Sequence, residues 1–434
     1  MDFPLMAFLT LEDPRAAIKG SRDPLGVQPV WTHFGRRLVA NLTTASTSVR
    51  GFTTLLLGRY FGEELVAQEK AKPEDCLDIL LRMEQLSAYA RHVGHGAGGE
   101  DIRGIVRVKA NITDNDRRVP IDLRGGVILS DQKVYGLWGL FSVPARTSGL
   151  IPDGPVGVTA ETRAFIESQY LPIIKPHLQT LYPMLLKGGF LDTRRKDGML
   201  GALIAILRPD FSRPEQNFYG DMLRDGGTAP QDSQGRQERF RRLLQKSGVL
   251  GQPFGRTAMV ALRRTAPKID EEIAGVLDQI LAIEALIAPA EALYAHLLTR
   301  SEARTETVSQ DFLKKWGKKV PNIDRGSLED QLPALEKKEI ILLGIPKLML
   351  DCAESLLNGD YASAVGQVIE WNRLVMAARG GGPWVVVGNE KQLDVRFHGQ
   401  MQALPSKEEL PWLWHNSYFI DALMSVTTQL ERGR

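Results

Sequence analysis

Cysteine is almost absent from this chain, which has only two cysteines among 434 residues, Cys76 and Cys352. Two cysteines do not build a disulfide framework, and they do not complete a zinc site unaided. Their scarcity excludes the small disulfide-rich secreted class of protein. We expect two reduced and mostly buried thiols in a cytoplasmic protein.

Secretion and membrane signals are also missing. The N-terminal segment carries Asp2, Glu12 and Asp13 and lacks the basic region and long apolar core of a signal peptide. No apolar run approaches the roughly 20 residues that cross a bilayer. The composition, with 43% hydrophobic and 24% charged residues, is that of a soluble globular protein. We therefore expect no membrane partner.

Motifs of catalysis with fixed spacing are absent, including the phosphate-binding loop G-x-x-x-x-G-K-[ST], the nucleophile elbow G-x-S-x-G and the zinc motif H-E-x-x-H. The one metal-like group is His92 and His95, followed by Glu100 and Asp101. Metal ligands need rigid positions, whereas the interspersed glycines predict a flexible hinge with exposed histidines: Gly94, Gly96, Gly98 and Gly99. We predict no catalytic residue, no metal and no cofactor.

Positive charge, by contrast, is concentrated in one segment. Residues 235–268 contain nine Lys or Arg and a single acid, Glu238, so this segment carries +8 whereas the whole chain carries +2. A surface of one sign suits a phosphate backbone or an acidic protein. The residues that we predict to contact such a partner are Arg236, Arg239, Arg241, Arg242, Lys246, Arg256, Arg263 and Arg264.

The spacing within this segment predicts a helix with two different sides. Arg236, Arg239, Arg242 and Lys246 recur at intervals of three, three and four residues, which places them in one stripe on a helix, with Phe240, Leu243 and Leu244 nearer the opposite side. Three interpretations stay open for the segment: contact with DNA or RNA, contact with an acidic protein, and an ordinary solvated surface.

The length predicts about three lobes. The expected fold is mainly α with small β-hairpins (α+β), including a winged-helix-like segment. We expect an N-terminal helical lobe at 1–98, a β-hairpin with the winged-helix-like segment at 99–180, a basic helical segment at 181–268, and a C-terminal helical lobe with one hairpin at 269–434.

Helix signals are clear at several places. A Ser/Thr tract at 43–48 precedes a buried apolar helix that reaches residue 60, and Pro73 opens a second helix that reaches residue 90. Asp360 caps a later helix, which stops at Gly380, and a last helix runs from about residue 417 to 431. The Ser/Thr tract is also a candidate anion site, because helix N-termini attract negative charge, although capping alone explains it.

Strand signals follow a period of two. Val106, Val108, Ala110 and Ile112 alternate with polar residues before a turn at 114–116 and a second alternating run at 119–123, which predicts a hairpin. The sequences WVVV and LDVRF predict another hairpin across 388–392. Four tryptophans lie between residues 371 and 414; they suit an aromatic core better than a stacking surface for bases: Trp371, Trp384, Trp412 and Trp414.

A seven-residue repeat follows the basic segment. Apolar residues recur at intervals of four and three, which gives a narrow seam suited to helix packing, interrupted at Pro289: Ile269, Ile273, Val276, Ile280, Ile283 and Ile287. The seam could pack within the chain or assemble with another copy; an internal partner is favoured because helical hairpins are common. For assembly, the residues concerned are Ile273, Val276, Ile280, Ile283 and Ile287.

Two stretches carry resemblances. A helix from residue 133 that ends at Ser148-Gly149-Leu150-Ile151, a short strand at 157–159 and a Thr-initiated helix after it resemble the back half of bacterial winged-helix domains, although Pro144 lies in the candidate recognition helix. The stretch 22–60, with the turn Asp23 to Gly26, the Ser/Thr tract and RGFTTLLLGRYF, resembles the opening of uncharacterised bacterial proteins found in phage-defence and restriction gene clusters.

The second resemblance implies a role in defence. It leads us to expect a non-catalytic subunit of a bacterial anti-phage defence or restriction complex, with an ATPase or nuclease among its partner subunits. The basic segment would contact DNA, RNA or an acidic partner. Two alternatives are a metal-dependent nuclease with carboxylates dispersed in the sequence and a winged-helix transcriptional regulator.

Overall fold

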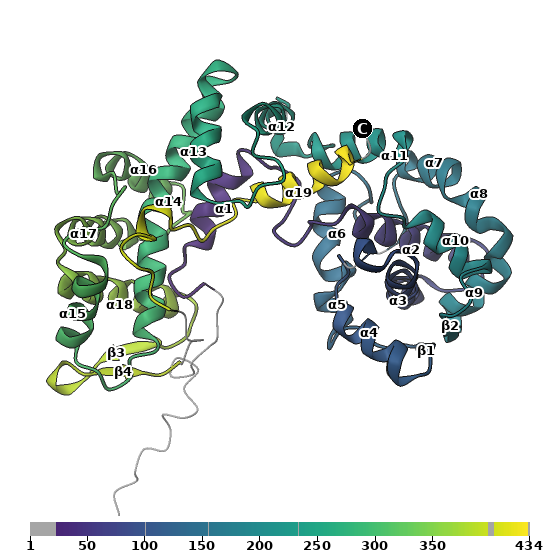
Figure 1. Ribbon diagram of the computed structural model, residues 1–434, viewed down its shortest axis with the longest axis horizontal. Helices are drawn as coiled ribbons and strands as arrows, with labels where there is room; N and C mark the ends of the chain where they lie inside the picture. The colour runs from purple at the N-terminus through teal and green to yellow at the C-terminus, as the bar shows by residue number, and fades with distance from the viewer. Residues whose placement is uncertain (1–22, 100, 155, 233, 398–402, 433–434) are drawn as a thin grey trace, which may run out of the picture. The chain divides into compact units, whose positions relative to one another are not determined.

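The protein is described by a computed structural model that covers residues 23–99, 101–154, 156–232, 234–397 and 403–432. The expectation about the N-terminal fifteen residues therefore lies outside the described residues. The fold is mainly helical with two small two-stranded antiparallel sheets (Figure 1), as predicted. The chain divides into two compact units, and each unit is built from segments far apart in the sequence.

The first unit comprises Met1–Gly35 and Gln252–Tyr418, and the second comprises Arg36–Gly251 and Phe419–Arg434. These boundaries differ from the four consecutive segments expected from the sequence. Closure of the second unit by residues 419–434 is a contact between distant segments, which composition and spacing do not indicate.

The elements of the first unit surround one long helix. They are α1 (Gln28–Arg36, whose last residue falls in the second unit), α13 (Arg256–Thr265), α14 (Glu271–Leu297), α15 (Thr305–Trp316), α16 (Arg325–Lys337), α17 (Ile345–Asn358), α18 (Tyr361–Ala378), β3 (Val385–Val387) and β4 (Leu393–Val395). Asp360 caps α18 through the Ser363 amide, and β3 pairs with β4, so both sequence predictions for this region are confirmed.

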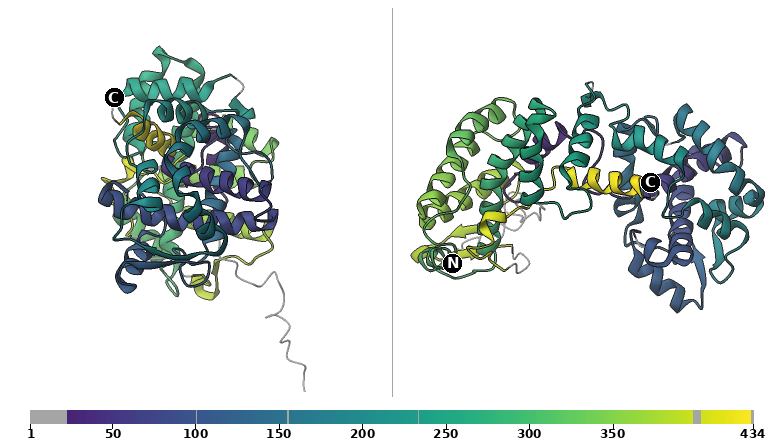
Figure 2. Two further views of the ribbon diagram at one scale, coloured as in Figure 1. Left: turned by 90° about the vertical axis from the view of Figure 1, so that its right-hand side faces the viewer. Right: turned by 45° about the horizontal axis from the view of Figure 1, so that its top comes forward.

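The predicted seam lies on α14 and is buried inside the first unit. Ile273, Val276, Ile280, Ile283 and Ile287 are all 0% exposed. Helix α14 contacts α13, α16, α17 and α18 (Figures 1 and 2). The internal partner is therefore confirmed, and these residues do not form a surface for assembly with another chain.

Three further features of α14 correct or extend the sequence predictions. The helix continues through Pro289 to Leu297, so the proline does not end it. Although α14 is long and apolar enough to cross a membrane, 78% of its most apolar stretch is buried, as in the core helix of a soluble protein. Its buried Glu284 accepts hydrogen bonds from the Asn416 amide at 3.0 Å and from the Tyr418 hydroxyl at 2.8 Å, which fixes the end of this unit to the helix.

The second unit is built around the antiparallel pair of α2 (Val49–Ala67) and α3 (Cys76–His95). Around them lie α4 (Ile105–Asp114), α5 (Gln132–Tyr135), α6 (Leu137–Thr147), α7 (Ala160–Gln169), α8 (Leu171–Ile174), α9 (Leu178–Lys187), α10 (Gly198–Ile206), α11 (Arg213–Tyr219), α12 (Arg236–Ser247), α19 (Ile420–Glu431), β1 (Arg118–Ile121) and β2 (Gly189–Asp192). A Cβ at Gly58 would lie 3.1 Å from the Leu80 Cα atom, so this glycine permits the close approach of α2 to α3.

The hairpin expected at 106–123 is wrong. Residues 105–114 form α4, because Ile105, Val108 and Ile112 are spaced three and four residues apart and turn one helical side inward, with Val108 fully buried. The second expected strand is β1, but its partner is β2, with Val119 opposite Leu191. A short run of apolar residues fits both the period of a strand and the period of a helix, so spacing alone does not distinguish the two structures.

Two smaller expectations also need correction. The glycines after His92 do not form a hinge: Gly94 lies inside α3, and Gly96–Gly99 continue as a 3-10 turn. Residues 157–159 are not a strand, and α6 continues through Pro144 to Thr147. The winged-helix resemblance thus rests on α6 and the Thr159-capped α7.

The burial of α14 predicts a large effect of polarity at its centre. We expect Ile280→Asp to lower the free energy of unfolding by at least about 3 kcal/mol, because it places a carboxylate in an apolar contact and removes buried methyl groups. Urea denaturation followed by circular dichroism measures the effect. Asp278→Asn, at an exposed position on the same helix, is the control and should change stability by less than about 1 kcal/mol. Equal stability of the two variants would contradict the packing described here.

Candidate functional site

Helix α12 packs with one side against the rest of the second unit. Gly235 and Gly248 adopt left-handed conformations at its two ends, with φ values of 62° and 69°. The Asp232 carboxylate caps the first turn by accepting hydrogen bonds from the amides of Arg236 and Gln237. Phe240, Leu243 and Leu244 are all 0% exposed, and their burial fixes the orientation of the helix.

Two of the four predicted cations, Arg242 and Lys246, lie on the opposite, exposed side of α12, so the two-sided helix is confirmed in part. We call Arg236, Arg239, Arg242 and Lys246 the α12 stripe. Arg242 and Lys246 are exposed, and Arg236 and Arg239 are half-buried. Arg242 forms an ion pair with Glu238 one turn before it. Such an exposed pair contributes little energy, so it leaves the guanidinium able to exchange partners.

Arg241 belongs to the interior rather than to the stripe. Its side chain is only 12% exposed, and its Nε lies 2.7 Å from Asp225 Oδ1. Arg224 pairs with the same carboxylate, also at 2.7 Å. Its burial and its ion pair do not favour the predicted role of Arg241 as a contact residue: this arginine attaches α12 to the turn at 224–225.

The cations of α13 lie in the other compact unit. Arg263 pairs with Asp278 at 2.5 Å, and burial lowers the pKa of Arg256, whereas Arg264 is exposed. The boundary between the units, after Gly251, separates α12 from α13. The basic run is thus continuous in sequence but divided between two bodies, and part of its charge is balanced by acids that lie outside the run.

Charge nevertheless differs between the two units. The second unit contains 32 Lys and Arg against 26 Asp and Glu, a net charge of +6. The first unit contains 22 against 26, a net charge of −4. The +2 of the whole chain conceals this difference, which becomes visible only once the units are known.

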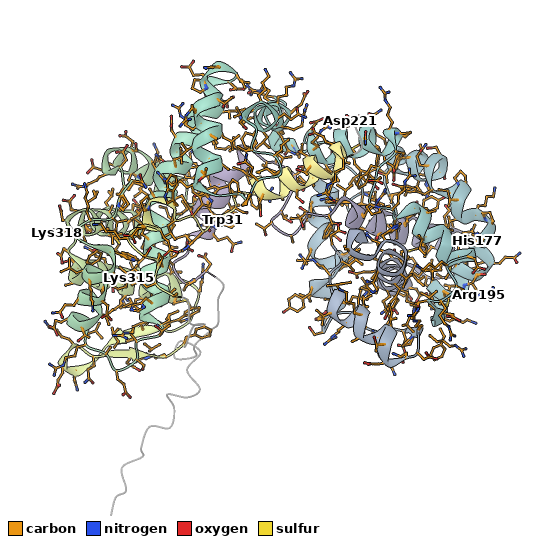
Figure 3. All side chains as sticks on the ribbon, in the orientation of Figure 1. Trp31, His177, Arg195, Asp221, Lys315 and Lys318 are labelled. Atoms are coloured by element: carbon orange, nitrogen blue, oxygen red, sulfur yellow. The ribbon has the colours of Figure 1, made fainter. Side chains whose placement is uncertain are left out.

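A second group of cations, which the sequence analysis missed, lies at β1 and β2. Strand pairing brings Arg117 and Arg118 close to the segment after β2, which contains Arg194, Arg195 and Lys196 (Arg195 is labelled in Figure 3). Phe190 is 63% exposed, and the Arg118 guanidinium lies 5.2 Å from the centre of its ring. Asp192 and Asp197 reduce the surplus by pairing with Arg194 and Arg195.

The Ser/Thr tract caps α2 through Ser48, which agrees with the simpler of the two interpretations of this tract. Ser48 accepts a hydrogen bond from the Gly51 amide at 3.2 Å and starts α2. Arg50, two residues later, is 1% exposed and pairs with Glu215 at 2.5 Å. It also donates to the carbonyls of Arg208 and Asp210, both at 2.7 Å. Arg50 is therefore an internal connection and not an anion ligand.

His92 and His95 lie on the last turn of α3. The His95 Nε2 atom lies 2.9 Å from the Ile204 carbonyl oxygen, and burial lowers the pKa of this histidine. Asp101 instead contacts Ser48 and Arg91, and Glu100 lies outside the described residues. Within the described ranges, no group of three or more His, Cys, Asp or Glu side chains is placed to hold a metal ion.

The tryptophans divide between core and surface. Trp371 and Trp384 are 1% and 2% exposed, which fits an aromatic core, whereas Trp412 is 62% exposed. The two buried rings cannot stack on bases.

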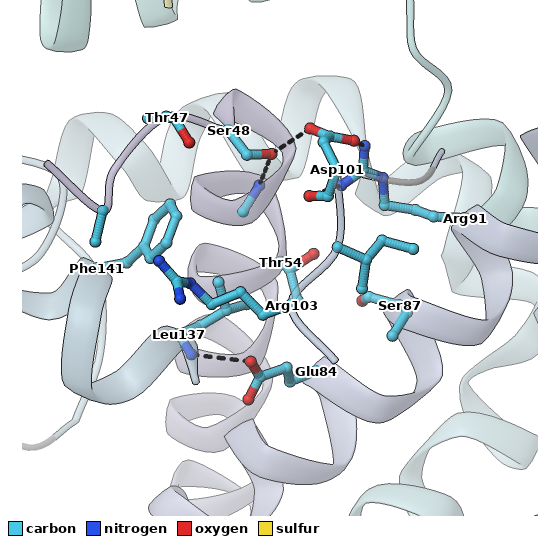
Figure 4. Close-up of a pocket in the computed structure, with 14 residues that line it drawn as sticks. Thr47, Ser48, Thr54, Glu84, Ser87, Arg91, Asp101, Arg103, Leu137 and Phe141 are labelled. Atoms are coloured by element: carbon cyan, nitrogen blue, oxygen red, sulfur yellow. Dashed lines mark hydrogen bonds and ion pairs between the residues drawn. The ribbon is translucent and has the colours of Figure 1, made fainter. Parts of the chain in front are cut away.

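A polar cavity lies beside the first turn of α2 (Figure 4). Its floor contains Glu84, whose carboxylate accepts hydrogen bonds from the Leu137 amide and the Gln132 side chain, each at 2.9 Å. Burial raises the pKa of Glu84 from its ordinary 4.5 to about 7, against the opposing effects of these hydrogen bonds and of Arg103.

Comparison with known proteins gives no relative: no family model, no curated protein and no solved structure matches this chain.

The internal role of Arg50 predicts a large loss of stability on truncation. Arg50→Ala should lower the free energy of unfolding by about 3–5 kcal/mol, because it leaves the Glu215 carboxylate buried without its cation. Arg213→Ala, which removes an exposed arginine nearby, should change stability by less than about 0.5 kcal/mol. Urea titration compares the two variants. A cost for Arg50→Ala no larger than that of the control would show that the pair does not support the unit.

The raised pKa of Glu84 predicts a pH dependence with a definite sign. The folded protein binds this proton more tightly than the unfolded chain does, so the contribution to stability is present below about pH 4.5 and is lost as the pH rises to about 7. The stability of the wild type relative to Glu84→Gln should therefore fall by about 3 kcal/mol between about pH 4 and pH 8. Urea titrations at several pH values measure this difference, and a difference that does not change with pH would contradict the assignment.

Proposed function

We propose that this protein is a non-catalytic binding subunit that contacts the phosphate backbone of a nucleic acid through the α12 stripe. The observation that carries the proposal is the exposure of Arg242 and Lys246 on the outer side of a firmly packed helix, with Arg236 and Arg239 half-buried, in a unit with a net charge of +6. Phosphate contacts of this kind supply affinity without sequence specificity.

The geometry of the stripe suits an extended anion. Ten residues separate Arg236 from Lys246, and at 1.5 Å per residue the stripe is about 15 Å long. Double-stranded DNA carries one charge per about 1.7 Å of its axis, so several phosphates lie within reach of such a stripe. The buried Phe240, Leu243 and Leu244 hold the helix in place, which lowers the entropic cost of binding.

The resemblance of residues 22–60 to proteins encoded in phage-defence gene clusters supports the biological context. We place the protein in a bacterial cytoplasmic defence or restriction complex, where an ATPase or nuclease would supply catalysis. The seam of α14 is used inside the first unit, so assembly with other subunits would use other surfaces.

Neutralising the stripe should weaken binding without unfolding the protein. For the triple variant Arg239→Gln, Arg242→Gln and Lys246→Gln, the slope of log affinity against log salt concentration should fall by about 3, since each phosphate contact contributes about 0.9. Fluorescence anisotropy with a labelled DNA duplex and the equivalent RNA at several salt concentrations measures the slope. The melting temperature should fall only slightly, because Arg242 and Lys246 are exposed charges that contribute little to stability and Arg239 is half-buried.

The matched control removes the same charge from the first unit: Lys314→Gln, Lys315→Gln and Lys318→Gln, three exposed residues on or just after α15 (Lys315 and Lys318 are labelled in Figure 3). This control should bind as the wild type does. If both triple variants weaken binding equally, the contact is not at the stripe. If the wild type shows no salt-dependent binding to DNA or RNA, the nucleic-acid proposal fails and an acidic protein becomes the better partner.

A further inference from the structure

The polar cavity of the second unit has a volume of about 240 Å³. It is lined by the first turn of α2, the middle of α3, the segment 101–103 and the start of α6 (Figure 4). Leu137 and Phe141 give it an apolar wall, whereas Glu84, Ser87, Arg91 and Arg103 are polar. This mixture of an apolar wall with a few polar groups is typical of small-molecule sites.

Two buried polar atoms of the lining have no partner. Among the described residues, neither Ser87 Oγ nor Arg91 Nε forms a hydrogen bond. Ser87 is 2% exposed and Arg91 is 5% exposed, so bulk water does not reach these atoms easily. Such buried groups usually have partners, and leaving one unsatisfied costs about 1–3 kcal/mol. Both lie on the side of α3 that faces the cavity in Figure 4.

A third group places a positive charge in the lining, which also contains Arg91 and the acids Glu84 and Asp101. In the part of the chain that the structure describes, the exposed Arg103 side chain makes no hydrogen bond and no ion pair; partial desolvation lowers the pKa of its guanidinium, against the opposing effect of Glu84. Arg103 lines the cavity together with Phe141 and Glu84 (Figure 4).

The neighbouring contact of Asp101 shows which chemistry this region accepts. The Asp101 carboxylate receives a hydrogen bond of 2.7 Å from the Ser48 hydroxyl and pairs with Arg91. Its side chain is 45% exposed, whereas that of Arg91 is 6% exposed. A carboxylate is thus already bound at the N-terminus of α2 by buried donors, where the helix dipole also favours an anion.

We propose that this cavity binds a small organic anion, either a carboxylate or a phosphate ester, with its acid group on Arg103 and its apolar body against Phe141 and Leu137. Ser87 Oγ and Arg91 Nε lie behind the surface of the lining, and a small shift of either side chain would bring a further donor to the ligand. The fixed Glu84 carboxyl group accepts a hydrogen bond from a donor at the ligand's other end. The site lies apart from the α12 stripe in sequence and chemistry, so it does not depend on the proposed contact with nucleic acid.

Probes that differ only in charge test the site. Benzoate and phenyl phosphate represent the two classes of anion, and benzamide and phenol are their neutral counterparts. Isothermal titration calorimetry and thermal denaturation of the full-length protein should show binding of at least one anion and of neither neutral compound. Binding of benzoate alone identifies a carboxylate site, and binding of phenyl phosphate alone identifies a phosphate-ester site.

Variants locate the binding. Arg103→Gln should weaken the affinity for the anion at least about tenfold, since a charge-assisted hydrogen bond is lost. Arg107→Gln removes an exposed arginine four residues later and should change the affinity by less than about twofold. Circular dichroism checks that both variants fold. The inference is overturned if neither anion binds, if neutral and charged probes bind equally, or if Arg103→Gln leaves the affinity unchanged.

Discussion

The buried ion pair of Arg50 and Glu215 is the constraint on which the second unit depends. Burial alone would raise the pKa of Glu215, but Arg50 together with the hydrogen bonds from Ser212 and Tyr170 holds it below its ordinary value. Glu215 also accepts a hydrogen bond from the Tyr170 hydroxyl at 2.9 Å. Because both charges are out of water, each requires the other, and the contact allows little freedom in the position of α2 relative to α11.

This constraint has consequences for the surface. Fixing the first turn of α2 fixes Ser48, and Ser48 in turn holds Asp101 beside Arg91. Ser48, Asp101 and Arg91 line the polar cavity, so these contacts hold part of its wall in place. Helix α12 has a comparable anchor in Arg241, whose ion pair with Asp225 leaves the outer side of the helix for solvent or a partner. At α12 the buried Arg241 holds the helix on which Arg242 is exposed, so two adjacent arginines have different roles.

Local features of the sequence predicted much of the fold. Ser48, Thr159 and Asp360 cap helices where expected, because capping depends on residues within one turn. The repeat from Ile273 to Ile287 predicted a buried helix. Its regular spacing gives the helix one apolar side, whichever helices pack against that side. The pairing of β1 with β2 was not predicted, because Val119 and Leu191 are far apart in the sequence and no spacing rule relates them. For the same reason, the sequence did not identify Asp225 as the ion-pair partner of Arg241. Nor did it single out Ser87 and Arg91, because only the folded structure shows that they line a cavity.

The basic run is divided between two units, and the proposed function places nucleic-acid contact on α12 and not on α13. Photo-crosslinking to a DNA duplex containing bromouracil, followed by proteolysis and mass spectrometry, tests it most directly. We expect crosslinked peptides from residues 235–248 and none from residues 256–265. Crosslinks confined to α13 or elsewhere in the first unit, or a complete lack of crosslinks at low salt, would contradict it.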